Sequence, residues 1–159
     1  MKIAKKIDIA SLPDWCRKWD FLDIIERKST AHGLNPYHVI ALVMTESGGN
    51  HLAVRYEGAP KIIRDKSGAI LKVKPGFRWT YEIESFAKML KASKETVEMM
   101  QSTSWGLCQV MGVRFFELGG ALEPLPEYRW PTVMLDKRIG LEYGCRAWKA
   151  HERHHFMAD

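Results

Sequence analysis

The alternation of apolar and polar positions along the chain predicts a mainly helical protein. Apolar residues recur at helical spacing over 13–31, 81–91, 94–101 and 104–118. A last long helix is expected to open at Pro131, with its aromatic and aliphatic side chains in the core. Helices therefore account for most of the expected fold.

A further helix is marked by its end signals. Asn35 is placed to cap it and Pro36 to occupy its first turn, ahead of an apolar run at 39–44. The glycines at 48 and 49 predict its end. Glu46 is therefore expected in the last turn of a buried helix.

One segment departs from the helical pattern. Residues 61–64 and 69–73 read as strands, and the polar stretch 65–68 between them reads as a turn, so a β-hairpin is expected. No internal repeat or linker is visible, and 159 residues suit one compact domain. We expect a single domain over 1–159, of a mainly α, α+β class.

Composition bears on cofactors, export and membrane insertion. The three cysteines, Cys16, Cys108 and Cys145, fit neither a disulfide framework nor a zinc site, so no metal or other cofactor is expected. The basic N-terminus lacks the apolar core of a signal peptide, and no run approaches the length of a membrane span. We expect a protein made in a cytoplasm without a signal peptide and without membrane insertion.

The net charge of +5 would attract a polyanion. The basic residues are scattered, however, and no cluster falls on one predicted recognition helix, so nucleic acid is not the expected partner. A non-enzymatic basic module that binds DNA or a virion stays open as an alternative.

Glu46 carries the clearest chemical signal. It follows Val43 by three positions, Leu42 by four and Val39 by seven, so it shares their stripe on the helix. Partial burial and the negative end of the helix dipole both favour the neutral carboxylic acid. A glycosidase needs such an acid to protonate a leaving sugar oxygen. The alternative is a surface carboxylate ahead of a glycine helix stop.

A second motif lies downstream. Residues 41–50 read ALVMTESGGN and residues 102–112 read STSWGLCQVMG. A helix-borne Glu-Ser-Gly followed by Ser-x-x-x-Gly-Leu-x-Gln resembles the lytic transglycosylases of the soluble type, whose fold is shared with goose-type lysozymes. Cys108 stands where that family often has methionine. The resemblance covers roughly 36–50 and 102–148.

The resemblance implies a lysozyme-like fold with a cleft between a helical lobe and a smaller lobe. The substrate would be the GlcNAc-MurNAc glycan of peptidoglycan, and no obligatory protein partner is implied. Glu46 would protonate the glycosidic oxygen and then act as base on the muramic acid 6-hydroxyl. This route leaves a 1,6-anhydro sugar.

The family's other positions map onto this chain by motif. Ser47 matches the usual neighbour of the catalytic acid, and Gln109 matches an amide that contacts the substrate. Ser104 and Gly106 match the turn that lines the cleft. Tyr143, in a Gly-x-x-Tyr step, is expected among the substrate-binding set or packed behind it.

Two departures from the family stand out. Residues 51–101, with the expected hairpin, separate the two motifs where the family often has a short connection. The chain also lacks the Ala-Tyr-Asn-x-Gly segment that usually follows. Either Tyr56 or Tyr81 fills that role, or this is a shortened form.

A hydrolytic muramidase is the main alternative. It would need a second carboxylate, for which Glu57 and Asp65 are candidates. Glu57 could reach across the cleft, or it could be a surface carboxylate paired with Arg55 or Arg64.

An enzyme of this kind without a signal peptide must reach the wall by other means. A bacteriophage endolysin released from the host cytoplasm, or a lysin carried in the virion, fits this expectation. The histidines at 151–155 are expected to belong to a solvated tail and not to a metal site.

Overall fold

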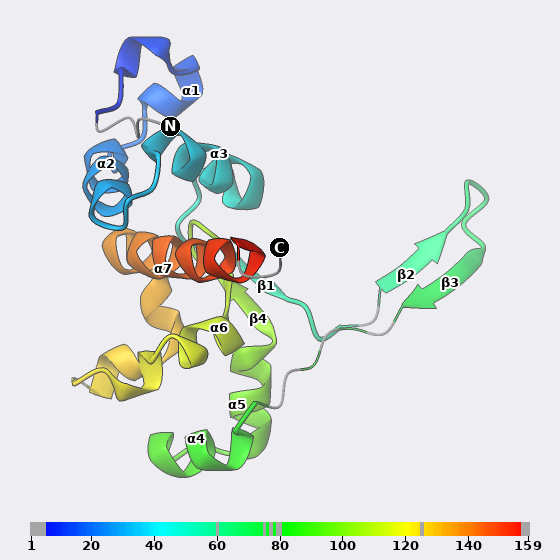
Figure 1. Cartoon of the computed structure of the whole chain (residues 1–159). Helices are drawn as coiled ribbons and strands as arrows, with labels where there is room; N and C mark the ends of the chain where they lie inside the picture. Colours follow the sequence, from blue (N-terminus) through cyan, green and yellow to red (C-terminus); the bar gives the residue numbers. More distant parts are fainter. Residues whose placement is uncertain are drawn as a thin grey trace. The chain divides into compact units, whose positions relative to one another are not determined.

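The computed structural model describes residues 6–59, 61–74, 76, 78, 81–124 and 126–156 (Figure 1). The chain divides into two compact units. Unit 1 comprises 1–53, 105–110 and 132–159, and unit 2 comprises 54–104 and 111–131. The expectation of one domain stays a prediction, and each unit is described by itself.

The first expected helix, 13–31, is wrong in its middle. A 3-10 turn at Ile9–Ser11 leads to α1 (Asp14–Arg17), and α2 (Leu22–Ala31) follows after a break. Within the break the rings of Trp19 and Phe21 stack with centroids 5.1 Å apart. Residues two apart do not face each other on a helix, so this stacking is incompatible with a continuous helix.

Helix α3 (Pro36–Ser47) matches the sequence prediction at both ends. The Asn35 side chain accepts a hydrogen bond from the backbone N–H of Tyr37, and Pro36 opens the first turn. Gly48 ends the helix with a φ of 61°, in the left-handed region that favours glycine. Glu46 consequently lies in the last turn.

The last helix begins later than expected. Pro131–Leu135 form a 3-10 helix, and α7 runs over Lys137–Phe156. The Asp136 carboxylate caps α7 by accepting hydrogen bonds from the backbone N–H groups of Arg138, at 2.8 Å, and Ile139, at 3.1 Å. An aspartate cap therefore sets the start of the helix, not the proline.

The core of unit 1 is drawn from all three of its chain segments. Its side chains come from α2, α3, the 105–110 segment, the 3-10 helix Pro131–Leu135 and α7. The fully buried members include Ile25, Val39, Val43, Leu107, Met134 and Leu141. Burial of these side chains joins segments far apart in the sequence.

The expected helix over 104–118 is wrong in its first half. The chain there forms β4 (Thr103–Trp105), a turn, and β5 (Val110–Met111), and only then α6 (Gly112–Glu117). Gly106 and Gln109 in the turn have φ values of 70° and 45°. Left-handed residues cannot continue a right-handed helix.

Unit 2 contains most of the remaining elements. β1 (Val54–Tyr56) pairs with β4 and β4 with β5, giving the order β1-β4-β5. Helices α4 (Ile83–Leu90) and α5 (Lys94–Gln101) fall within the expected segments. Two further 3-10 turns occupy Gly120–Leu122 and Pro126–Arg129. Its buried aromatic and aliphatic residues include Phe86, Val97, Val113, Phe115 and Phe116.

The expected hairpin is confirmed. β2 (Lys61–Arg64) pairs antiparallel with β3 (Ile70–Lys74), with an irregularity in register between Ile63 and Arg64. The molecule is thus mainly helical with small antiparallel sheets, compatible with the expected α+β class. Within the described residues, no helix has both the length and the apolar character to cross a bilayer.

Candidate active site

The end of α3 fixes the position of Glu46. Gly48 donates its backbone N–H to Met44 O and turns the chain out of the helix. Gly49 follows with a φ of 87°, and a Cβ there would lie 2.4 Å from the Trp19 indole nitrogen. The two glycines therefore have structural tasks within unit 1, ending the helix and admitting the Trp19 ring.

The Glu46 side chain is half-buried and lines a pocket of about 400 Å³. One wall is the face of α3 that carries His38, Leu42 and Thr45, and the other includes Trp148 from α7. The His38 and Trp148 rings lie nearly parallel, with centroids 6.5 Å apart. A carboxyl group thus lies beside an aromatic, largely apolar surface.

Trp148 was expected in the core, but it is only half-buried and borders this pocket. Its indole N–H donates to Glu152 Oε1 at 3.2 Å, which holds one edge of the ring. His38 and Leu42 precede Glu46 by eight and four positions, so helical periodicity could have placed them on its face. Nothing in the sequence alone pairs Trp148 with that face.

Ser47 links α3 to the turn that carries the second motif. Its hydroxyl donates to Leu107 O at 2.7 Å and lies 3.2 Å from Val43 O. The structure therefore brings the end of α3 and the 106–109 turn together. The Ser47 hydroxyl is committed to this backbone contact.

Cys108 lies within electrostatic reach of Glu46. Burial raises the pKa of the Cys108 thiol far above its usual range, and Cys145 and the Glu46 carboxylate raise it further. A Cβ on Gly144 would lie 2.4 Å from the Cys108 sulfur, so the missing side chain makes room for the thiol against α7. Cys108 is a neutral packing residue beside the candidate acid.

Gln109 braces the turn. Its side-chain amide nitrogen donates to Ala53 O at 3.0 Å and to Gly106 O at 2.9 Å, and the residue is 9% exposed. A Cβ on Gly106 would lie 2.1 Å from Met134 O. Both amide protons of Gln109 are thus used inside the protein.

Tyr143 is 3% exposed, with the Arg146 guanidinium 5.0 Å from its ring centroid. Its burial agrees with packing behind the site and not with direct contact to a glycan.

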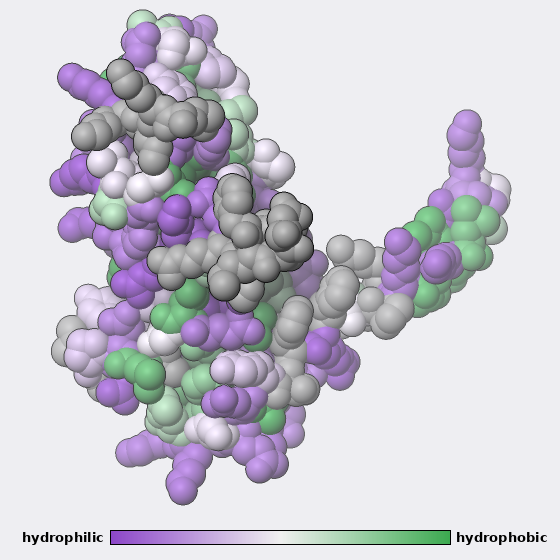
Figure 2. Space-filling view, viewed as in Figure 1, coloured by the Kyte–Doolittle hydropathy of each residue, from purple (hydrophilic) through white to green (hydrophobic). Residues whose placement is uncertain are grey.

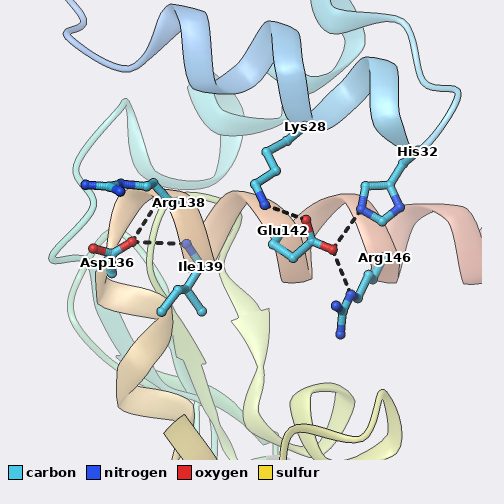
Figure 3. Close-up of polar contacts among 7 residues, drawn as sticks. All are labelled: Lys28, His32, Asp136, Arg138, Ile139, Glu142 and Arg146. Carbon is cyan, nitrogen blue, oxygen red and sulfur yellow. Dashed lines mark hydrogen bonds and ion pairs between the residues drawn. The ribbon is translucent and has the colours of Figure 1, made fainter. Parts of the chain in front are cut away.

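A charged cluster beside Tyr143 was missed by the sequence reasoning (Figure 3). Glu142 on α7 accepts hydrogen bonds from Lys28 Nζ at 2.8 Å and Arg146 Nε at 2.9 Å, and lies 3.0 Å from His32 Nε2. Burial alone would raise the pKa of Glu142, but these three partners outweigh it and lower the pKa to about 2. The cluster ties α2 to α7.

Three expected site residues, Tyr56, Glu57 and Ser104, belong to unit 2. Tyr56 on β1 is 45% exposed, and a Cβ on Gly58 would lie 2.2 Å from its hydroxyl oxygen. Ser104 on β4 is buried, and its hydroxyl lies 3.0 Å from Met111 Sδ. β1 and β4 are neighbouring strands, so these two residues share one sheet.

Glu57, the candidate second carboxylate, is 8% exposed and paired with Arg55. The backbone N–H of Glu57 donates to Ser102 O at 2.8 Å. The Arg55 partner is one of the two that the sequence offered. Asp65, the other candidate carboxylate, lies in the turn of the hairpin.

The side chains able to bind a metal are scattered over the described part of the chain. Among the residues that the structure describes, no three His, Cys, Asp or Glu side chains gather as a metal site. The side chains of residues 153–156 and the whole of 157–159 lie outside the description, so most of the C-terminal histidine cluster falls there.

Comparison with protein-family models, curated proteins and solved structures finds no significant match.

Proposed function

We propose that this protein is a peptidoglycan lytic transglycosylase that cleaves the MurNAc-GlcNAc β-1,4 bond with Glu46 as its acid and base. The observation that carries the proposal is the position of Glu46: a half-buried carboxyl group in the last turn of α3, lining a pocket with an aromatic wall. The linkage of α3 to the Gly-Leu-Cys-Gln turn through Ser47 supports it.

The chemistry needs one carboxyl group. Protonated Glu46 gives its proton to the glycosidic oxygen as the bond to the anomeric carbon breaks. The resulting carboxylate takes the proton of the MurNAc 6-hydroxyl, whose oxygen bonds to the anomeric carbon. The products are a free GlcNAc hydroxyl and a 1,6-anhydro-MurNAc end, and Glu46 is again protonated.

The walls of the pocket suit a sugar ring. The Trp148 ring is half-buried and is held at one edge by Glu152, so little conformational freedom is lost when it contacts a ligand. An aromatic face offers apolar contact to the C–H face of a pyranose, while its polar edges stay hydrated. Trp148 is therefore assigned to glycan binding beside Glu46.

The second candidate is a hydrolytic muramidase, in which Glu57 is the second carboxylate. The ion pair with Arg55 fixes the position of the buried Glu57 carboxylate, as such a mechanism requires. Either enzyme would act on the cell wall after release from a host cell, or from a virion.

The test is lysis of purified cell walls by the Glu46→Gln variant. We expect a loss of at least about 10³-fold in rate, because the amide can neither give nor take the proton. Glu84→Gln, an exposed glutamate change on α4, is the matched control and is expected to keep full activity. Full activity of Glu46→Gln in a folded protein would end the proposal.

Mass spectrometry of the released muropeptides separates the two mechanisms. Products lighter by one water than the reducing muropeptides indicate 1,6-anhydro ends and support the transglycosylase. Reducing ends, together with loss of activity in Glu57→Gln, would support the muramidase instead.

A further inference from the structure

The hairpin formed by β2 and β3 exposes an unusual number of large apolar side chains. Figure 2 shows hydrophobic and hydrophilic residues side by side on this segment. The apolar members and their exposed fractions are Ile62 at 52%, Ile63 at 39%, Ile70 at 55%, Leu71 at 65% and Val73 at 55%. Apolar groups gathered in one exposed place mark an interaction surface.

The strand register sorts these side chains onto two faces. Ile62 is paired with Val73 and Arg64 with Ile70, and cross-strand partners share a face. Ile63, paired with Lys72, lies on the opposite face, because successive residues of a strand alternate. The irregularity in register adds one residue, Leu71, to β3, so Ile70 lies opposite Arg64 and on the same face as Ile62 and Val73. We call Ile62, Ile70 and Val73 the apolar face of the hairpin.

The same segment carries most of the net charge. Residues 61–74 contain four lysines, one arginine and one aspartate, so they contribute a net +4 to a chain whose total is +5. The Ser67 side chain and the Ala69 backbone hydrogen-bond to the Asp65 carboxylate and lower its pKa. Asp65 is thus ionised at neutral pH and engaged within the turn.

The turn gives the hairpin a defined conformation. Asp65 Oδ1 accepts from the backbone N–H groups of Ser67, at 2.8 Å, and Ala69, at 3.0 Å, and Arg64 donates to Gly68 O at 2.8 Å. A two-stranded hairpin is nevertheless only marginally stable in water unless its apolar side chains are covered. A surface that buries them would stabilise it.

We propose that this hairpin docks on an anionic lipid bilayer. The apolar face enters the boundary between head groups and acyl chains, and Arg64, Lys66, Lys72 and Lys74 contact the lipid phosphates. An anionic polymer would match the charge but leave the apolar face in water, whereas an anionic bilayer matches both. Strands of four and five residues are too short to span the bilayer, so the docking is peripheral.

This docking is independent of glycan cleavage. It uses hairpin side chains alone, and none of Glu46, Trp148 or the 106–109 turn takes part. Failure of one proposal therefore leaves the other standing, and purified walls, which contain no bilayer, separate the two activities.

The first experiment is co-sedimentation of the full chain with phosphatidylglycerol-containing vesicles and with phosphatidylcholine vesicles. We expect binding to the anionic vesicles only. The double variant Ile62→Ser/Ile70→Ser should weaken it by at least about tenfold, because serine contributes no apolar burial. Met99→Ser/Leu122→Ser removes two apolar side chains of similar exposure elsewhere, and it should bind as the wild type does.

The second experiment tests the charge. Lys72→Gln/Lys74→Gln should weaken binding to the anionic vesicles by about fivefold per charge, and Lys18→Gln/Lys88→Gln should have a smaller effect. All variants should keep the wild-type circular dichroism spectrum and lytic activity on purified walls. Absence of vesicle binding would overturn the proposal. So would unchanged binding by the isoleucine variant, or preferential binding to a DNA duplex, which would show attraction by charge alone.

Discussion

At the scale of single residues, Trp148 is the side chain whose position differs most from its sequence expectation. It borders the pocket of Glu46 with its ring half-exposed, close to the His38 ring. Aromatic residues on helix faces are usually buried in the core, and only the lining of the Glu46 pocket identifies Trp148 as one of its walls. Its contribution can be separated from that of Glu46 by kinetics.

We expect Trp148→Ala to raise the KM for soluble glycan chains by about tenfold, equivalent to about 1.4 kcal/mol, with a smaller change in kcat. Trp148→Phe keeps an aromatic surface and should recover most of the affinity. Trp15→Ala is the control, because Trp15 is 46% exposed in the same unit and does not line the pocket. Equal effects from Trp148→Ala and Trp15→Ala would contradict the assignment.

Gly106 is the second residue whose surroundings lead to a testable prediction. Its φ is 70°, and a Cβ there would lie 2.1 Å from the backbone oxygen of Met134. Gly33, with a φ of 68° and open space around it, is a matched comparison. The two glycines share a backbone conformation and differ in their surroundings.

Urea unfolding should therefore separate them. Gly33→Ala should lower the free energy of unfolding by about 1–2 kcal/mol through backbone strain alone. Gly106→Ala should lower it by about 3 kcal/mol or more, because backbone must also move. Equal losses would mean that the approach to Met134 O is not tight in solution.

At the scale of elements, the contact between α2 and α7 depends on the carboxylate of Glu142. Its pKa is about 2 in the folded protein, below the ordinary value of 4.5 for the unfolded chain. The stabilisation is complete above the unfolded value and is lost as pH falls from about 4.5 to about 2, where the unfolded state binds the proton first. The cluster should thus make the protein sensitive to acid.

Unfolding by urea at several pH values tests this. Glu142→Gln should be less stable than the wild type at pH 7, and the difference should shrink as the pH falls below about 4.5. Glu84→Gln, which removes an exposed ion pair with Lys94, should leave the pH dependence nearly unchanged. A stability difference that is constant with pH would contradict the role of the Glu142 charge.

The elements also show what the sequence could predict. α3 was predicted to within its end residues, because Asn35, Pro36 and Gly48 each act on the backbone next to them. The hairpin was also predicted, because the polar residues of its turn, such as Asp65, bond to the backbone next to them. Local signals therefore sufficed wherever the chain's own neighbours decide its conformation.

The misses have long-range or backbone causes. The helix predicted over 104–118 does not form in its first half, because Gln109 adopts a positive φ. Hydrogen bonds from its side-chain amide to Ala53 O and Gly106 O hold this conformation. In the candidate site, the two sequence motifs pointed to Glu46, Ser47 and the 106–109 turn. Trp148 and the Glu142 cluster could not be found this way, because their partners lie far away in sequence.

At the scale of the whole molecule, all three cysteines belong to unit 1. Burial raises the pKa of each thiol, that of Cys145 to about 12, so thiolate is scarce in the folded state. Thiols react as thiolates, and these react only after opening. Thiol reactivity should therefore report on unit 1 alone.

With Ellman's reagent, we expect labelling at pH 8 to be more than about hundredfold slower in the folded protein than in urea. A cysteine introduced as Ser85→Cys, at an exposed position of α4 in unit 2, should react at once and serves as control. Rapid labelling of all three native thiols without denaturant would show that unit 1 opens readily.

The division of unit 1 into three chain segments has a consequence for synthesis. The helix that carries Glu46 is synthesised well before α7, which carries Trp148 and Glu142. A nascent chain that lacks 132–159 contains Glu46 but not Trp148, the opposite wall of its pocket. It also lacks Glu142, the partner of Lys28 on α2. The candidate site can therefore form only after α7 has been translated, about ninety residues after the helix that carries Glu46.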